Sequence, residues 1–508
     1  MSESPDRFRY PDWKAPAGDG EVLVWPEPTK LLAETEENGK RLRGALRVMV
    51  QGVPLAEVRR AMRGWVGVQD EKQPVVATGH QTELYHPGVW VKDALINSAA
   101  AKLGGQAFHF GVDTDEPKHL EVRWPGGREP ITDDPALRTA EWCGLLAPPT
   151  PAHLGWLEGA ARGAAKGWGF TPALWEFLAA MRRLSLESVN LASAITNAVH
   201  QLDWELGLRH HALLTSPLLG CEAYLLFVHH HLARAGEMAR QYNAALGEYR
   251  REQKIRTPGR PMPDLKVSGD MCEVPFWLDR VGTGRRQRAT VVRDQEVQGG
   301  WALRLEGGER FIFEESAEGW EAAKRLGRWL ADRELRLSPR ALTLTMFLRL
   351  FVADQFVHGI GGARYDQVLD RLIEREFGLE PPRFSVTTAT LYFPDAVGRT
   401  RACLPCVKQE GHRLRHNLLG EEKGKLVAAI AEAPRGSLER AQRFAELHER
   451  LGAAAERDER MRAWESQLGE TQKAAEEDEV LFDRELFFAI QPRERLEGMI
   501  GRYRGMFE

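Results

Sequence analysis

The fold is decided by residues 74–116, PVVATGHQTELYHPGVWVKDALINSAAAKLGGQAFHFGVDTDE. Residues 74–78 are a short apolar run typical of a buried strand, and residues 107–112 are a second one. Between them, residues 87–103 have an apolar helical pattern that opens with Pro-Gly and is followed by Gly-Gly. A strand, a helix and a strand in this order predict a βαβ unit and therefore a parallel sheet.

Outside this unit the pattern divides the chain into regions of different character. We expect an N-terminal helical segment at 1–70, the first part of a sheet core at 71–123, a mainly helical insertion with core elements at 124–270, a β-hairpin segment at 271–310, the second part of the core at 311–420, and a coiled-coil helical arm with a C-terminal segment at 421–508. Leu342 to Val357 is expected to be one buried helix that leads into a glycine-rich loop at 358–362. The coiled coil rests on a seam of Leu447, Ala454, Met461 and Leu468, which are seven residues apart, with Phe444 and Leu451 flanking it. A Pro-Arg-Gly break at 434–436 before this seam predicts a helical hairpin.

Composition excludes several classes of protein. The chain has 508 residues, with 69 Lys and Arg against 73 Asp and Glu and a net charge of −4, so it lacks the basic excess of a nucleic-acid-binding protein. Five cysteines do not make a disulfide scaffold and suit a reducing compartment. We find no signal-peptide pattern at the N-terminus and no apolar run of the roughly 18 residues that a membrane helix needs. A cytoplasmic protein with no membrane or nucleic-acid partner is expected.

Polar residues follow both strands of the βαβ unit at the edge where ligands of parallel sheets bind. They are Thr78, Gly79, His80 and Gln81 after the first strand, and Asp113, Asp115 and Glu116 after the second. We expect His80 to act as a base, because its ordinary pKa lies near 6.5, or to contact a phosphate group. Asp113 and Asp115 are expected to orient an ammonium group. The structural alternatives are a helix cap or simple packing for His80, and turn formation or helix capping for the two aspartates.

Three segments resemble the bacillithiol-synthesis cysteine-adding enzymes. Residues 75–81 (VVATGHQ), with Pro87, Gly88 and Lys92 after them, resemble the Thr-Gly-Gln-Gln segment of that family. FGVDTDE at 110–116 stands where the family has an acidic Glu-Asp-His-Asp strand end, and SPRAL at 338–342 and GIGGARY at 359–365 resemble its Asn/Pro-containing helix and Gly-Pro-Gly…Tyr loop. The order along the chain also matches.

This resemblance implies a fold and an activity. The expected fold class is α/β, with a Rossmann-like parallel-sheet core, inserted helical and β connective segments, and a C-terminal coiled-coil arm that forms a homodimer. The implied activity joins cysteine to the amine of glucosaminyl-malate. In this picture Lys92, Arg364 and Arg383 hold anionic groups, and Gly359, Gly361 and Tyr365 line the pocket. ATP with Mg²⁺ is an expected cofactor, because amide formation from a free carboxylate is uphill.

The sequence departs from the family pattern within the expected site. His80 replaces the first Gln of the motif, and Val112 and Thr114 stand in the places of the acidic motif's Glu and His. Two other functions therefore stay open: a non-catalytic binding or assembly protein that keeps the fold, and a class I-like nucleotidyl or aminoacyl transferase with another acceptor. Ala-Thr-Gly-His at 77–80 matches only half of that class's His-x-Gly-His signature.

A rival site lies near the predicted arm. Cys403, Cys406, His412 and His416 have ligand types that suit a tetrahedral zinc ion, although the spacing between the pairs is shorter than in zinc fingers. Coincidence is the simpler interpretation, and we expect no metal. A redox Cys-x-x-Cys is less favoured, because the pattern does not predict that it opens a helix after a strand.

Overall fold

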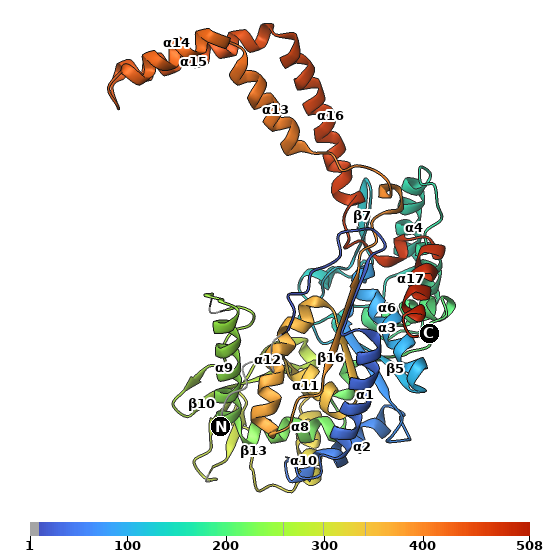
Figure 1. Cartoon of the computed structure of the whole chain (residues 1–508). Helices are drawn as coiled ribbons and strands as arrows, with labels where there is room; N and C mark the ends of the chain where they lie inside the picture. Colours follow the sequence, from blue (N-terminus) through green and yellow to red (C-terminus); the bar gives the residue numbers. More distant parts are fainter. Residues whose placement is uncertain (1–9, 258, 298, 341) are drawn as a thin grey trace. The chain divides into compact units, whose positions relative to one another are not determined.

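The computed structural model describes residues 10–257, 259–297, 299–340 and 342–508 of a mixed α/β chain (Figure 1). The described residues form two compact units. The first unit contains residues up to 123, 127–391 and 484–508, and the second contains 124–126 and 392–483. The C-terminal segment, which was predicted to follow the arm, therefore belongs to the same unit as the sheet.

The first unit is built on a six-stranded sheet with the order β1-β16-β15-β4-β5-β8. Its strands are β1 (Val22–Trp25), β4 (Val75–Gln81), β5 (Gln106–Val112), β8 (His211–Leu214), β15 (Gln355–His358) and β16 (Phe384–Ala389). All neighbouring pairs are parallel except β1 and β16. The predicted βαβ unit is confirmed, because β4 and β5 pair in parallel on either side of a helix at Pro87–Leu103.

Helices cover both faces of this sheet (Figure 1). The α-helices that the structure describes in the first unit are α1 (Pro28–Arg43), α2 (Leu55–Trp65), α3 (Pro87–Leu103), α4 (Pro151–Ala165), α5 (Leu174–Leu184), α6 (Leu191–Glu205), α7 (Thr215–Leu218), α8 (Glu222–Ala233), α9 (Ala235–Glu252), α10 (Gly319–Ala331), α11 (Leu342–Phe351), α12 (Ile360–Phe377) and α17 (Arg493–Gly505). The helices with contacts to the strands of this sheet are α1, α3, α6, α7, α11 and α12. Ala77, Phe108 and Phe356 point to the face where they join the large apolar core with α11 and α12. His109, one residue along β5, points to the opposite face and contacts α3.

A second, antiparallel sheet has the order β13-β12-β11-β10-β14, with β9 beside β10. Its strands are β9 (Val267–Ser268), β10 (Met271–Arg280), β11 (Arg285–Arg293), β12 (Trp301–Arg304), β13 (Arg310–Phe313) and β14 (Leu335–Pro339). Two short pairs, β2 (Met49–Val50) with β3 (Val53–Pro54) and β6 (Glu121–Trp124) with β7 (Gly127–Pro130), complete the strands that the structure describes. The hairpin predicted at 271–310 is thus part of a larger sheet.

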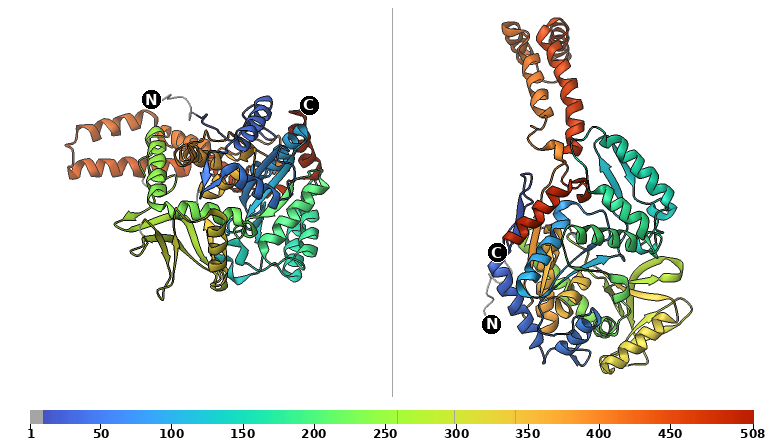
Figure 2. Two further views of the ribbon diagram at one scale, coloured as in Figure 1. Left: turned by 90° about the horizontal axis from the view of Figure 1, so that it is seen from below. Right: turned by 90° about the vertical axis from the view of Figure 1, so that its right-hand side faces the viewer.

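The second unit consists mainly of helices in pairs. Its helices are α13 (Leu404–Asn417), α14 (Gly420–Glu432), α15 (Leu438–Arg457) and α16 (Glu459–Leu481). The right-hand view in Figure 2 and the contacts within this unit place α13 beside α16, and α14 packs on α15. Leu447 and Leu451 of the predicted seam are buried against Ile430, whereas Phe444 is 53% exposed. The predicted break at 434–436 separates α14 from α15.

The predicted helix at 342–357 is wrong in its second half. It ends at Phe351, and Gln355–His358 form β15, which pairs in parallel with both β4 and β16. After the helix ends, the backbone of these residues pairs with β4, and Oδ2 of Asp354 accepts a hydrogen bond from the backbone N–H of Val75 at 2.8 Å. The glycine-rich segment that begins at Gly359 therefore follows a strand and opens a helix, contrary to the prediction.

None of the helices among the described residues combines the length and the apolar character that crossing a membrane requires.

Candidate functional site

The order of the strands creates a switch point at the centre of the main sheet. The chain leaves β4 through α3 toward β5, and it leaves β15 through α12 toward β16 on the other side. Ligands of open α/β sheets bind outside the carboxyl ends of the strands at such a point. A cavity of about 210 Å³ lies beyond the end of β4, and it is lined by His80, Gln81, Glu83, Leu84, His86, Val89, His119 and Glu485.

His80 is held as a neutral imidazole with one nitrogen available for chemistry. Its Nδ1 lies 3.2 Å from the carbonyl oxygen of Gln81 and 3.3 Å from Oε1 of Glu83, so Nδ1 carries the proton. No residue that the structure describes forms a hydrogen bond to Nε2. Burial, assisted by the nearby charge of Lys92, lowers the pKa of His80 well below its ordinary value. The side chain is therefore an unprotonated acceptor at neutral pH, which is the state a general base requires.

Glu83 was not singled out from the sequence, yet it is part of this site. Burial raises the pKa of its carboxyl group to about 7, and the charge of Lys92 opposes that rise. A carboxyl group that titrates near neutrality can give or take a proton under ordinary conditions. The cavity thus combines a neutral imidazole with a carboxyl group poised for proton transfer.

Lys92 lies behind the cavity and contacts the motif that follows β4. Its Nζ donates a hydrogen bond to the carbonyl oxygen of Gly79 at 2.9 Å, and burial lowers the pKa of the amine to about 8. Gly79 itself allows a close approach between strands, because a Cβ there would lie 3.2 Å from the carbonyl oxygen of Phe110. Thr78 is buried and its hydroxyl donates to the carbonyl of Val357, which ties β4 to β15.

The acidic residues after β5 have different surroundings. Asp115 accepts a hydrogen bond from Nε2 of Gln81 at 2.7 Å and so contacts a residue that lines the cavity. Asp113 is buried, and its Oδ1 accepts from the hydroxyl of Thr215 and the backbone N–H of Ser216. These bonds hold the first turn of α7, so Asp113 has the structural role that the sequence left open as the alternative. Glu116 is exposed and pairs with Lys118 at 3.6 Å.

The 359–365 segment and Arg383 are placed on the other side of the switch point. Gly359 caps α12 after β15, and a Cβ at either Gly359 or Gly361 would meet open space. Arg364 pairs with Asp12 at 3.7 Å, and Tyr365 is 42% exposed. Arg383 lies 3.6 Å from Glu380. None of the residues of the 359–365 segment lines the cavity at His80, and Arg383 does not line it either. The geometry of the cavity therefore does not support their predicted roles in binding.

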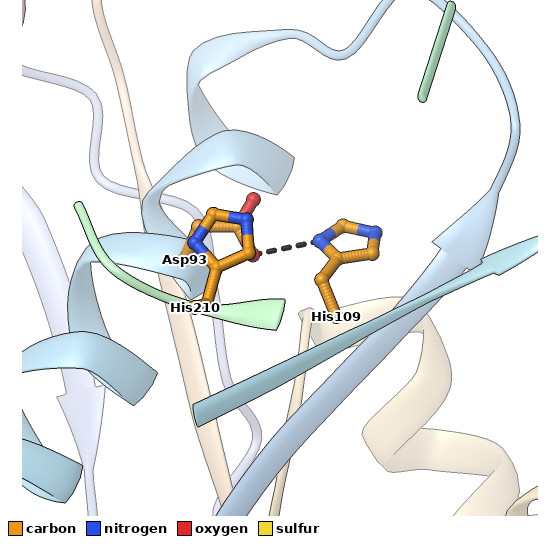
Figure 3. A group of neighbouring side chains, drawn as sticks. All are labelled: Asp93, His109 and His210. Carbon is orange, nitrogen blue, oxygen red and sulfur yellow. Dashed lines mark hydrogen bonds and ion pairs between the residues drawn. The ribbon is translucent and has the colours of Figure 1, made fainter. Parts of the chain in front are cut away.

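Asp93, His109 and His210 form a buried cluster behind the cavity (Figure 3). Their ligand-type atoms all lie within 4.8 Å of one another, and Nδ1 of His109 is 2.7 Å from Oδ1 of Asp93. Tyr85 stacks on the ring of His109 and places its hydroxyl 3.3 Å from Nε2. The ring of His80 meets the same tyrosine edge-on at 5.5 Å between centroids.

In this cluster, protons on the histidine nitrogens occupy the places that a metal ion would need. His109 donates Nδ1–H to the carboxylate of Asp93. Burial raises the pKa of Asp93, but the charges of His109 and His210 and this hydrogen bond help to lower it below its ordinary value. Asn97 directs its Nδ2 toward Nδ1 of His210, since its Oδ1 accepts from the backbone N–H of Arg209. His210 therefore carries its proton on Nε2, the nitrogen that lies 3.6 Å from Asp203. A metal ion would have to displace these protons, so the arrangement favours a rigid polar network that supports Tyr85 and His80.

The zinc hypothesis for the Cys-His segment is inconsistent with the structure. Cys403 and Cys406 are joined by a disulfide, which removes the two thiolates that zinc would need. The rings of His412 and His416 meet edge to face with 4.2 Å between their centroids, and Nζ of Lys423 lies 2.8 Å from Nδ1 of His416. Cys403 is the N-cap residue of α13, so the cysteine pair does open a helix, but a loop and not a strand precedes that helix.

Sequence reasoning found His80 and Gln81 but missed Glu83, His86 and Glu485. His86 caps α3 by accepting a hydrogen bond from the backbone N–H of Gly88, and it lines the cavity at the same time. The pattern His-Pro-Gly at a helix start was a usable signal for that cap. Glu485 lies about 400 positions further along the chain, and no local pattern could have placed it here.

Comparisons with known proteins add no family to this picture. Neither the scan against models of protein families nor the search of curated proteins found a match for the chain.

Proposed function

We propose that this chain is an enzyme that forms an amide between the carboxyl group of cysteine and the amine of an amino-sugar conjugate of the glucosaminyl-malate type. The observation that carries the proposal is the neutral imidazole of His80, which lines a cavity at the carboxyl end of a central parallel strand. An amine nucleophile must lose a proton as it attacks a carbonyl carbon, and His80 Nε2 can accept that proton. The resemblance of residues 75–92 to the cysteine-adding enzymes supplies the identity of the substrates.

The size and lining of the cavity support a small polar substrate. Its volume of about 210 Å³ is below the roughly 300–1,000 Å³ of pockets that take drug-sized ligands, and it suits an amino acid. Glu83 and Glu485 offer acceptors for an ammonium group, while Gln81 is held in place by Asp115. In this proposal His80 is the base, and Glu83 exchanges protons with the substrates or binds the cysteine ammonium.

The finer features implied by the resemblance belong to the same proposal. They are a Rossmann-like arrangement of the sheet, a coiled coil formed by the helices of the second unit, a homodimer through that arm, a cytoplasmic location and activation of the carboxylate by ATP and Mg²⁺. The parallel strands β15, β4 and β5 and the pairing of α13 with α16 are consistent with the first two.

A product assay tests this function. The purified full chain is incubated with cysteine and glucosaminyl-malate, with and without ATP and Mg²⁺, and the products are analysed by mass spectrometry. We expect cysteinyl-glucosaminyl-malate in the arm that contains ATP and Mg²⁺. A folded protein that forms no product in any arm would contradict the proposed substrates.

A further inference from the structure

The second unit carries a chemical group that the proposed function does not use. Cys403 and Cys406 are both exposed and joined by a disulfide at the start of α13. The other three cysteines, Cys143, Cys221 and Cys272, are free and buried. Burial raises the pKa of these buried thiols to about 12, 11 and 11 respectively, which makes them poor nucleophiles. The chain therefore has three buried thiols of low reactivity and one accessible pair of sulfur atoms.

The position of the pair favours a thiolate at Cys403. This residue is the N-cap of a helix of 14 residues, and its Sγ accepts a hydrogen bond from the backbone N–H of Cys406 at 3.3 Å. Helix N-termini stabilise negative charge, so a thiolate at Cys403 would be favoured over one in solvent. Arg401 and Lys408 flank the pair in the sequence and add positive charge to the segment.

The backbone on either side of the pair is anchored to α16. The N–H of Ala402 donates to Oδ2 of the buried Asp478 at 2.6 Å. The carbonyl of Val407 accepts from Nε1 of Trp464 at 2.7 Å, and Gly411 packs directly on the same indole. These contacts do not involve the sulfur atoms, so they persist when the disulfide is reduced. The two thiols would stay close together and the bond could form again.

We propose that Cys403 and Cys406 are a reversible dithiol–disulfide site that exchanges with low-molecular-weight thiols and their disulfides. In the oxidising direction, the Cys403 thiolate attacks a small disulfide RSSR, forms a Cys403–SR bond and releases RS⁻. The Cys406 thiolate then attacks Sγ of Cys403, the protein disulfide forms and a second RS⁻ leaves. Two electrons pass from the protein dithiol to RSSR, and the reverse sequence consumes two thiols. This site is independent of the proposed amide formation.

Exchange with glutathione tests the site in the full, native chain. The protein is equilibrated with mixtures of reduced and oxidised glutathione, alkylated without denaturation and digested for mass spectrometry. We expect the alkylated fraction of Cys403 and Cys406 to rise from none to nearly complete as the proportion of reduced glutathione increases. A pair that stays oxidised, or stays reduced, across all mixtures would overturn the proposal.

Single variants identify the attacking sulfur. Cys406→Ser should accumulate a glutathione adduct on Cys403, because the resolving thiol is absent. Cys403→Ser should react at Cys406 at least about tenfold more slowly, since that sulfur lacks the N-cap position. Equal rates for the two variants would contradict the role of Cys403. Cys272→Ser is the matched control, and the exchange at 403 and 406 should be unchanged in it.

Discussion

Replacing His80 with asparagine is expected to lower kcat for amide formation by about 10²–10⁴-fold, the usual contribution of a general base. Asparagine presents an amide N–H near the place of Nδ1, so the bond to the Gln81 carbonyl can be kept while Nε2 is removed. The KM for cysteine should change much less than kcat, because the remaining lining of the cavity stays in place. Steady-state kinetics with the mass-spectrometric assay measures both.

The pH dependence of kcat/KM provides a second test of His80 as the general base. A base is active when it is unprotonated, and the pKa of His80 lies well below its ordinary value in the folded chain. The limb of kcat/KM that belongs to His80 should therefore fall only at a pH well below 6.5. His153→Asn is a suitable control, since His153 bonds to the carbonyl of Pro130 away from the cavity. A His80→Asn enzyme with nearly wild-type kcat would rule out the proposed base.

Replacing Asp354 with asparagine is expected to destabilise the fold by about 3–5 kcal/mol, the cost of breaking a buried ion pair. The carboxylate lies 2.6 Å from Nη2 of Arg59 and 3.1 Å from Nη1 of Arg63, and all three side chains are about 2% exposed. It also accepts from the N–H of Val75 at the start of β4. The variant leaves two buried guanidinium groups without their counter-charge, so the loss exceeds that of one hydrogen bond.

Urea unfolding followed by circular dichroism measures this loss as a lower midpoint. Glu71→Gln is the matched control, because Glu71 pairs with Arg60 on the same helix α2 but both side chains are exposed, at 43% and 58%. An exposed pair contributes less than about 1 kcal/mol, so this control should unfold almost like the wild type. Equal destabilisation by the two substitutions would show that burial of the Asp354 pair is not what holds α2 to the sheet.

The sequence predicts local elements well where hydrophobic period and turn residues agree. The strand, helix and strand of residues 74–112 appear as β4, α3 and β5, and the helix has the bounds that Pro87 and Gly104 indicate. Hydrophobic periodicity does not distinguish a buried helix from a buried strand in a short apolar run. For that reason the prediction placed Gln355–His358 in a helix, whereas these residues form β15. Its identity depends on pairing with β4, which is a contact across nearly 280 positions.

The residues of the candidate site also fall into those that the sequence could predict and those that it could not. His80 and Gln81 could be predicted, because the carboxyl end of a parallel strand is a general place for ligands. The hydrogen bonds of Asp113 to the first turn of α7 could not be predicted, because they depend on where Thr215 and Ser216 lie in the folded chain. Whether a carboxyl group such as that of Glu83 titrates near neutrality depends on burial, which is a property of the packed chain.

The central claim is that cysteine binds in the cavity at the end of β4, with His80 in reach of the reacting amine. A crystal structure of the full chain with cysteine tests it most directly. We expect cysteine in the cavity lined by His80, Gln81 and Glu83, with its carboxyl group placed so that an attacking amine would lie within hydrogen-bond distance of His80 Nε2. Cysteine bound elsewhere on the chain, with this cavity holding only solvent, would contradict the account.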